Sequence, residues 1–228
     1  MVTPYYADDL VTLYLGDCRE ITEWLAADVL VTDPPYGIGW KRHGGGKATN
    51  GRGTDRHEGI EGDTDTRLRD NTLAAWGSRP SAVFGSFYAP PPADVRHVAV
   101  YLKPRNAGVL GSTTGLRRDV EPIYLTGPWP PRPAARSSVF TTASIAGNPS
   151  SPQGRYGHPH AKPVDLMEAL IAECPPGVIA DPFAGSGSTL VAARNLGRRA
   201  IGVELDERYC ETIAARLSQG ALDFGAVA

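Results

Sequence analysis

The chain has 228 residues, of which 41% are hydrophobic and 21% are charged, and its formal net charge is −2. The length predicts one globular domain, residues 1–228, since domains commonly have about 100–200 residues. The composition excludes a disordered charged chain and a uniformly basic nucleic-acid coat protein, although it leaves room for a local basic surface.

Cysteine content and sorting signals limit the cellular context. The three cysteines, Cys18, Cys174 and Cys210, are too few and too widely spaced for a disulfide scaffold or a paired-cysteine metal site. No apolar run approaches the roughly 18 residues that a membrane span requires. The first nine residues contain no Lys or Arg, unlike a signal peptide. We therefore expect a soluble, cytoplasmic protein without a metal and without a membrane partner.

Two strands are predicted in the N-terminal part. In residues 11–15, valine and leucine alternate with threonine and tyrosine, which is the period of a strand. The second strand, residues 28–32, runs directly into two prolines and therefore ends in a loop, Asp33-Pro34-Pro35-Tyr36. Ligands of open α/β sheets bind at the carboxyl ends of strands, so this loop is placed to meet a ligand.

The middle of the chain is irregular and locally basic. Residues 37–65 and 128–155 read as long loops, and long loops are usually functional or disordered. Residues 96–136 contain seven basic and two acidic residues. A phosphate backbone could bind such a surface, and a solvated loop surface is the alternative. The basic residues of the first loop are Lys41, Arg42, Lys47, Arg52 and Arg56.

Regular elements follow on either side of this region. Short buried strands are predicted at residues 82–84 and 98–102. The last third alternates helix and strand, which is typical of an α/β sheet. Its predicted elements are a helix beginning at Pro163, a strand at 177–180, a helix at 188–196, a strand at 200–203 and a helix from Asp206.

A glycine-rich turn in the last third predicts a cofactor site. Gly185 and Gly187 let a ligand approach the backbone, and the helix that follows offers free amides at its N-terminus. Glu204, at the end of the next strand, can accept both hydroxyls of a ribose. Leu190 stands where a dinucleotide fingerprint requires a small residue, and the only Gly-Lys pair does not fit a Walker loop. A single-nucleoside cofactor such as S-adenosylmethionine therefore fits best.

The loop Asp33-Pro34-Pro35-Tyr36 carries groups suited to an exocyclic amine. Such an amine on adenine or cytosine is a poor nucleophile, because its lone pair is delocalised into the ring. The Asp33 carboxylate and the Pro34 carbonyl, fixed by the proline backbone, could accept its protons and favour the pyramidal nitrogen that attacks. Tyr36 offers an aromatic face to a base taken out of the duplex, a stacking worth about 1–3 kcal/mol. Direct in-line methyl transfer then needs no covalent enzyme nucleophile.

These two motifs, in this order, resemble those of the amino-group DNA methyltransferases that act on adenine N6 or cytosine N4. They are similar to the permuted, or beta-type, subgroup, in which the catalytic motif precedes the cofactor motif. The segments 15–18 and 158–163 resemble two further elements of that family, and Lys103-Pro104 and Glu121-Pro122-Ile123 resemble its intervening core strands.

The resemblance implies a fold, a cofactor and a partner. The fold is the α/β class I S-adenosylmethionine-dependent methyltransferase fold, a mostly parallel seven-stranded sheet with one antiparallel strand and helices on both faces. The cofactor is S-adenosylmethionine, and double-stranded DNA is the partner. The candidate loops for DNA contact and target recognition are residues 37–65 and 128–155, with the five basic residues of the first loop as candidate DNA contacts. These loops are short for the family, so a homodimer or another partner could supply further contacts, and a restriction endonuclease is a further expected partner.

The resemblance and the residue chemistry together give the expected site. The catalytic residues are Asp33, Pro34, Pro35 and Tyr36. Asp17 is implied to contact the adenine of the cofactor, and the segment that ends at Pro163 is implied to lie against its methionine end. The expected cofactor-binding residues are Asp17, His160, Lys162, Pro163, Asp181, Pro182, Phe183, Ala184, Gly185, Ser186, Gly187, Ser188, Thr189, Glu204 and Leu205.

The resemblance implies site-specific methylation of DNA, and adenine N6 is favoured because, within the family, Asp at the first position of the tetrapeptide leans towards adenine, and Asp33 holds that position here. Cytosine N4 methylation, RNA base methylation and a catalytically silent nucleic-acid-binding domain of the same fold remain alternatives. An NAD-dependent oxidoreductase is disfavoured by Leu190. Trp24 and Trp76 are expected in the core, Cys18 and Cys210 as packing residues, and Cys174 in a surface loop.

Overall fold

The computed structural model describes residues 2–39, 62–104, 116–131, 136–143 and 161–223. Within these residues, nine strands form one mixed sheet in the order β1-β2-β9-β8-β3-β4-β6-β5-β7. The strands are β1 (Tyr6–Ala7), β2 (Val11–Leu15), β3 (Val29–Thr32), β4 (Ser81–Phe84), β5 (His97–Leu102), β6 (Val120–Thr126), β7 (Val139–Phe140), β8 (Ile179–Asp181) and β9 (Ala200–Glu204).

The expected seven-stranded sheet is present, and two short strands extend it. Seven strands have three or more residues, while β1 and β7 are two-residue additions at its edges. Among those seven, β6 alone is reversed, because it pairs antiparallel with both β4 and β5. Strands β2, β9, β8, β3 and β4 are parallel, so their carboxyl ends share one edge of the sheet.

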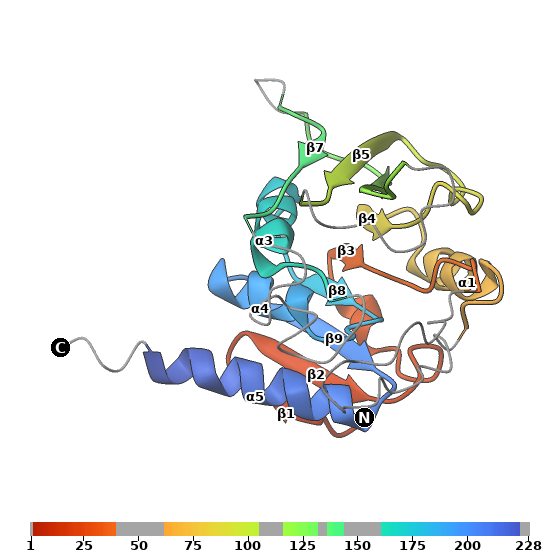
Figure 1. Cartoon of the computed structure of the whole chain (residues 1–228). Coiled ribbons are helices and arrows are strands. Elements are labelled where there is room, and N and C mark those ends of the chain that lie inside the picture. The colour runs from red at the N-terminus through yellow and green to blue at the C-terminus, as the bar shows by residue number, and fades with distance from the viewer. Residues whose placement is uncertain (1, 40–61, 105–115, 132–135, 144–160, 224–228) are drawn as a thin grey trace, which may run out of the picture.

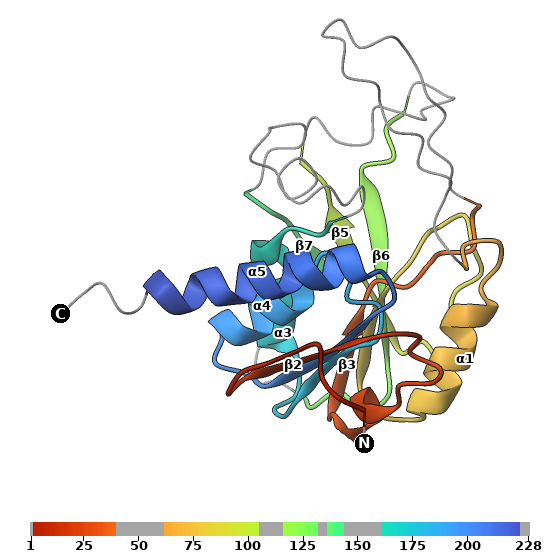
Figure 2. The same cartoon turned by 90° about the horizontal axis from the view of Figure 1, so that it is seen from below.

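Helices cover both faces of the sheet, as Figures 1 and 2 show. The helices α3 (Val164–Glu173), α4 (Ser188–Asn195) and α5 (Glu207–Asp223) lie on one face. The other face carries α1 (Arg67–Trp76) and the short 3₁₀ helix η1 (Glu23–Ala26). Strands β3 and β4 are buried along their whole length, which explains their continuous apolar character in the sequence.

Two hydrophobic clusters hold these layers together. The larger one joins the sheet to α3, α4 and α5, and the smaller one joins it to η1 and α1. The expectation for the tryptophans is confirmed, because Trp24 and Trp76 are each 2% exposed and their rings stack with centroids 5.9 Å apart. The packing roles of Cys18 and Cys210 are also confirmed, since both are buried.

The expectation for Cys174 was wrong. Its side chain is buried, not in a surface loop, and the thiol lies 3.4 Å from the carbonyl oxygen of Leu170. The reason is that α3 ends at Glu173 and Cys174 is its C-cap, with its backbone N–H donating to the Ile171 carbonyl of the last helical turn.

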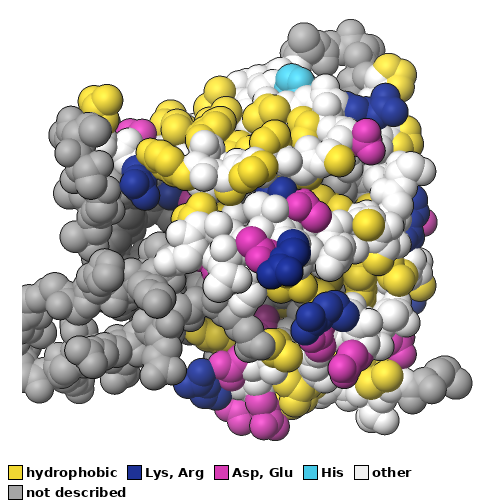
Figure 3. All heavy atoms as spheres, turned by 90° about the vertical axis from the view of Figure 1, so that its right-hand side faces the viewer, with side chains coloured by type: hydrophobic (Ala, Val, Ile, Leu, Met, Phe, Trp, Pro, Cys, Tyr) yellow, Lys and Arg dark blue, Asp and Glu magenta, His cyan; other side chains and the backbone are white. Residues whose placement is uncertain are grey.

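The outer strands are less completely covered. Side chains of β5, β6 and β7 remain exposed, namely Val98, Leu102, Val120 and Val139. Figure 3 shows hydrophobic side chains gathered near the top of this side of the molecule, where β5 and β7 lie in Figure 1. Of the helices that the structure describes, none combines the length and apolar character needed to cross a membrane.

Candidate active site

A cavity of about 1660 Å³ opens at the shared edge where the parallel strands end. Its lining includes residues that directly follow β2, β3 and β4 and the last residues of β8 and β9. The reversed strand β6 contributes its beginning, because its direction brings its N-terminal end to the same edge. The topology therefore gathers in one cavity segments that are far apart along the chain.

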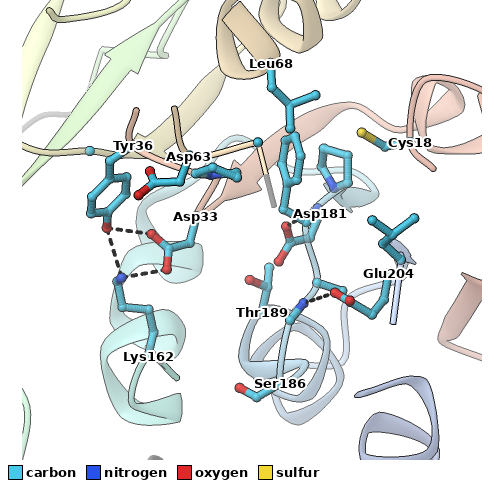
Figure 4. Close-up of a pocket in the computed structure, with 18 of the residues that line it drawn as sticks. Cys18, Asp33, Tyr36, Asp63, Leu68, Lys162, Asp181, Ser186, Thr189 and Glu204 are labelled. Atoms are coloured by element: carbon cyan, nitrogen blue, oxygen red, sulfur yellow. Dashed lines mark hydrogen bonds and ion pairs between the residues drawn. The ribbon is translucent and has the colours of Figure 1, made fainter. Parts of the chain in front are cut away.

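One side of the cavity is the glycine-rich loop between β8 and α4. The Gly185 backbone N–H donates to Glu204 Oε2 at 2.6 Å (Figure 4). The Asp206 N–H donates to Oε1 at 2.9 Å. Each carboxylate oxygen has two lone pairs, so each keeps one for a ligand hydroxyl. Gly187 has a left-handed φ of 79°, and a Cβ there would lie 2.7 Å from a side-chain atom of Ile213. Gly187 is therefore required where the loop packs on α5.

Asp181, at the end of β8, connects the glycine-rich loop to the neighbouring strand β3. Its Oδ1 accepts hydrogen bonds from the Thr32 hydroxyl at 2.7 Å and from the Phe183 N–H at 3.2 Å. Thr32 is the last residue of β3 and directly precedes Asp33. This buried carboxyl therefore fixes the spacing between the two halves of the site.

The carboxyls of Glu204 and Asp181 give the fold a pH dependence. Burial raises the pKa of Glu204 to about 7 and that of Asp181 to about 6, above their ordinary values of 4.5 and 3.8. Between about pH 4 and pH 7 the folded state therefore retains protons that the unfolded chain has released, so the free energy of unfolding falls as pH rises. We expect the melting temperature to fall from about pH 5 to about pH 8, and less steeply in Glu204→Gln. Equal slopes in the two proteins would contradict this assignment.

The other side of the cavity is the loop after β3. The Tyr36 hydroxyl donates to Asp33 Oδ1 at 2.6 Å, and the Lys162 ammonium donates to Asp33 Oδ2 at 2.6 Å (Figure 4). Lys162 also donates to the Tyr36 oxygen at 3.1 Å. Burial, with Asp33 close by, raises the pKa of the Tyr36 phenol well above its ordinary value, so the phenol stays protonated and donates.

A second ion pair lies behind this triangle. Glu121, near the start of β6, approaches Lys162 at 3.4 Å and Lys103 at 2.6 Å. Burial alone would raise the pKa of Glu121, but the ammonium groups of Lys162 and Lys103 lower it, so the carboxyl is ionised. Burial alone would lower the pKa of Lys162, but Asp33 and Glu121 raise it, so the ammonium stays charged.

Asp63 supports the backbone that follows the Asp33-Pro34-Pro35-Tyr36 loop. Its Oδ1 accepts from the Gly37 N–H at 2.7 Å and from the Ile38 N–H at 3.3 Å, and the side chain is 3% exposed. Gly37 has a φ of 75°, and a Cβ there would lie 2.5 Å from the Asp65 backbone. Sequence reasoning missed Asp63, because it lies in a stretch whose composition indicated only a loop.

Two exposed aromatic residues stand at the rim of the cavity. Phe87 and Tyr88 follow β4, line the cavity, and are 56% and 68% exposed. The Arg118 guanidinium lies 4.4 Å from the centroid of the Tyr88 ring. Sequence reasoning missed these residues too, and the signal was a pair of aromatic residues directly after a strand.

The structure brings most of the expected site residues together. Pro34, Pro163 and Gly187 are described but do not line the cavity, and Pro163 is instead the N-cap of α3. His160 and all five basic residues proposed for the first loop lie outside the described residues, as do most of residues 37–65 and much of 128–155. The expected residues that line the cavity are Asp17, Asp33, Pro35, Tyr36, Lys162, Asp181, Pro182, Phe183, Ala184, Gly185, Ser186, Ser188, Thr189, Glu204 and Leu205.

Two of these residues have neighbours that the sequence did not indicate. Asp17, after β2, accepts hydrogen bonds from the backbone N–H and the guanidinium of Arg19. Lys162, assigned by resemblance to the cofactor, contacts Asp33 and Tyr36 directly. Lys162 thus lies between the catalytic loop and β6.

The fold and the site together define a class of protein. A parallel sheet with one reversed strand and helices on both faces carries an acid after the glycine-rich loop and an Asp-Pro-Pro-Tyr loop two strands from that acid. This is the class I S-adenosylmethionine-dependent methyltransferase fold. Two solved structures share it. The M1.HpyAVI–SAM complex has a TM-score of 0.61 at 20% identity, covering 91% of this chain and 99% of that one. The cytosine-N4-specific PvuII DNA methyltransferase has a TM-score of 0.62 at 14% identity, covering 93% and 88%.

Sequence relatives narrow the class to a family. Residues 102–216 match the N6/N4 family model described as DNA methylase. YubD of Escherichia coli (strain K12), named as a methylase, is 32% identical over 235 residues, covering 92% of each chain. The type II methyltransferase M.ScaI of Streptomyces caespitosus is 42% identical over 69 residues, which span 29% of this chain and 23% of that protein. The chain belongs to the N6/N4 DNA methylases, the amino-group DNA methyltransferases.

Proposed function

We propose that this protein transfers a methyl group from S-adenosylmethionine to the N6 amino group of adenine in double-stranded DNA. One observation carries the proposal. Asp33, directly after β3, and Glu204, at the end of β9, line the same cavity, and only β8 lies between these two strands. An amine acceptor and a ribose acceptor are therefore held at a fixed separation, as joining a nucleoside cofactor to a base requires.

The residues around the glycine-rich loop fit this cofactor. Glu204 keeps one free lone pair on each carboxylate oxygen, which matches the two hydroxyls of a ribose. Phe183 and Leu205 add apolar surface to the same part of the lining. When bound, the cofactor supplies a methyl group on a positively charged sulfur, which an amine can attack in line.

Asp33 is the group that acts on the target amine. Tyr36 and Lys162 each use one lone pair of a different Asp33 oxygen, so each oxygen keeps one lone pair for an amine N–H. Hydrogen bonds from the amine N–H groups to Asp33 make the nitrogen lone pair more available for attack. The carboxylate can also receive the proton that nitrogen loses once it is methylated. In addition to any stacking of a flipped base, Tyr36 therefore orients Asp33.

Methylated nucleosides identify the product directly. Purified protein is incubated with S-adenosylmethionine and unmethylated duplex DNA, and the DNA is digested and analysed by mass spectrometry. We expect N6-methyladenine. N4-methylcytosine would leave the proposed mechanism unchanged and reassign the target base to cytosine. Product formed only on RNA would reassign the substrate to RNA. No product on either, with cofactor binding shown by calorimetry, would leave a silent nucleic-acid-binding domain.

The rim residues predict an effect on DNA binding. The exposed rings of Phe87 and Tyr88 are placed to stack on bases near the cavity, and stacking contributes about 1–3 kcal/mol per base. We expect the Phe87→Ala, Tyr88→Ala double variant to bind a DNA duplex at least about tenfold more weakly, by fluorescence anisotropy, with unchanged cofactor affinity. Val139→Ala, at an exposed site on β7, is the control. Unchanged DNA affinity in the double variant would remove the rings from the interface.

The cellular context follows from DNA as the substrate. We propose a DNA-associated enzyme of the cytoplasm, folded as one domain. The five basic residues between Lys41 and Arg56 stay predicted phosphate contacts. A second copy of the chain and a restriction endonuclease stay predicted partners.

A further inference from the structure

Four charged side chains form a continuous chain from the outer strands to the catalytic carboxylate. Lys103 Nζ lies 2.6 Å from Glu121 Oε1, Glu121 Oε2 lies 3.4 Å from Lys162 Nζ, and Lys162 Nζ lies 2.6 Å from Asp33 Oδ2. The four residues come from the end of β5, the start of β6, the segment before α3 and the loop after β3. All four line the active-site cavity.

Burying the Glu121 carboxylate costs free energy, which is unexpected for a residue that has no role in the site. Its Oε2 is inaccessible to solvent and makes no hydrogen bond within the described part of the chain. Its compensation is the charge of the two ammonium groups beside it. A buried ion pair contributes little net stability compared with a well-packed apolar pair, so its presence at a reaction centre favours a role in the reaction.

The contacts of Lys162 indicate how Glu121 can influence the orientation of Asp33. An ammonium has three N–H donors, and three oxygens lie around this one, on Asp33, Tyr36 and Glu121. The ring of Phe84, with its centroid 4.8 Å from Nζ, closes a further side. With Glu121 on one side and Asp33 on the other, the ammonium is held in one place. Asp33 is thereby held in one orientation.

Charge balance gives the arrangement an effect on the chemistry. Two ammonium and two carboxylate groups sum to zero, whereas the attacking amine gains positive charge as it is methylated. If Glu121 lost its charge, the cluster would carry a net positive charge beside that nitrogen. Electrostatic effects in a water-poor site are large, so the barrier would rise.

We propose that Glu121, supported by Lys103, is a positioning residue for methyl transfer, which holds the Lys162 ammonium against Asp33 and keeps the cluster neutral. The catalytic part of this inference rests on the proposed function, whereas the coupling of Glu121 to Asp33 through Lys162 does not.

Kinetics of charge variants test the catalytic part. We expect Glu121→Gln to lower kcat by about tenfold or more, with cofactor and DNA affinities within about twofold of wild type. Adding Lys103→Met restores neutrality, so the double variant is expected to recover most of the lost kcat. Glu173→Gln, which removes a surface ion pair with Arg136 at the end of α3, is the matched control and is expected to leave kcat unchanged. A Glu121→Gln kcat equal to wild type, or a double variant no better than the single one, would overturn the catalytic role.

A stability cycle tests the coupling without any activity. Unfolding free energies are measured for Glu121→Gln, Asp33→Asn and their combination, in wild type and in a Lys162→Met background. Because both carboxylates share one ammonium, we expect their effects to be non-additive with Lys162 present and additive without it. Additivity in both backgrounds would overturn the positioning role. If wild type methylates no DNA while the cycle shows coupling, the proposed function fails, the catalytic role of Glu121 falls with it, and the positioning of Lys162 stands.

Discussion

Replacement of Asp33 by alanine is expected to abolish methyl transfer and to leave cofactor binding intact. The Asp33 carboxylate supplies the lone pairs that an amine can donate to, and general base groups of this kind contribute about 10²–10⁴-fold to rates. Among the described residues, the Asp33 side chain is hydrogen-bonded to Tyr36 and Lys162, whereas the glycine-rich loop and Glu204, which carry most of the expected cofactor contacts, are bonded to each other. We therefore expect kcat to fall at least about a thousandfold, measured with labelled methyl donor, and the cofactor Kd to stay within about twofold by calorimetry.

Two further variants separate the causes of this loss. Asp33→Asn keeps one carbonyl acceptor and removes the charge, so an intermediate rate is expected if hydrogen bonding to the amine and charge both matter. Asp9→Ala, at an exposed position in the turn between β1 and β2, is the control for a surface aspartate and is expected to behave as wild type. If Asp33→Ala lost only about one order of magnitude in rate or less, Asp33 would have no place in the mechanism.

Replacement of Glu204 by alanine is expected to act on the cofactor instead. Hydrogen bonds to charged groups contribute about 1.5–3 kcal/mol each, so losing two ribose contacts should weaken S-adenosylmethionine binding by roughly a hundredfold or more. Calorimetry measures this directly. At saturating cofactor, kcat is expected to change little, because Asp33 and its partners are untouched.

The control for Glu204 addresses its second role. Its oxygens also accept the backbone N–H groups of Gly185 and Asp206, so alanine leaves two donors without their partner. Glu204→Gln retains one carbonyl acceptor and fits the same space. Because glutamine keeps one acceptor, we expect it to bind the cofactor with an affinity between those of wild type and alanine; if the alanine variant bound the cofactor as tightly as wild type, the ribose role would be wrong.

Local patterns in the sequence were enough for most of the sheet and for the cofactor loop. The strands at residues 11–15 and 28–32 and the helix–strand alternation after Pro163 appear where their periodicity predicts them. Helix α1 was not anticipated, because its buried face includes Arg69 and Thr72 and its pattern is not that of an apolar stripe. Arg69 is paired there with its neighbour Asp70 and donates to the Pro90 carbonyl, a contact that only the fold provides.

The site residues show the same distinction between local pattern and tertiary contact. Local composition was enough to place Asp33 and Glu204 at strand ends of an α/β sheet, because strand ends and turns have characteristic residues. The neighbours of Asp33 could not be read from the sequence and are set by the fold. Lys162 lies 129 positions from Asp33 along the chain, and Glu121 reaches the cavity because β6 runs against its neighbours. Spacing along the chain carries no information on such contacts, because strand order and direction are set by the packing of the whole sheet.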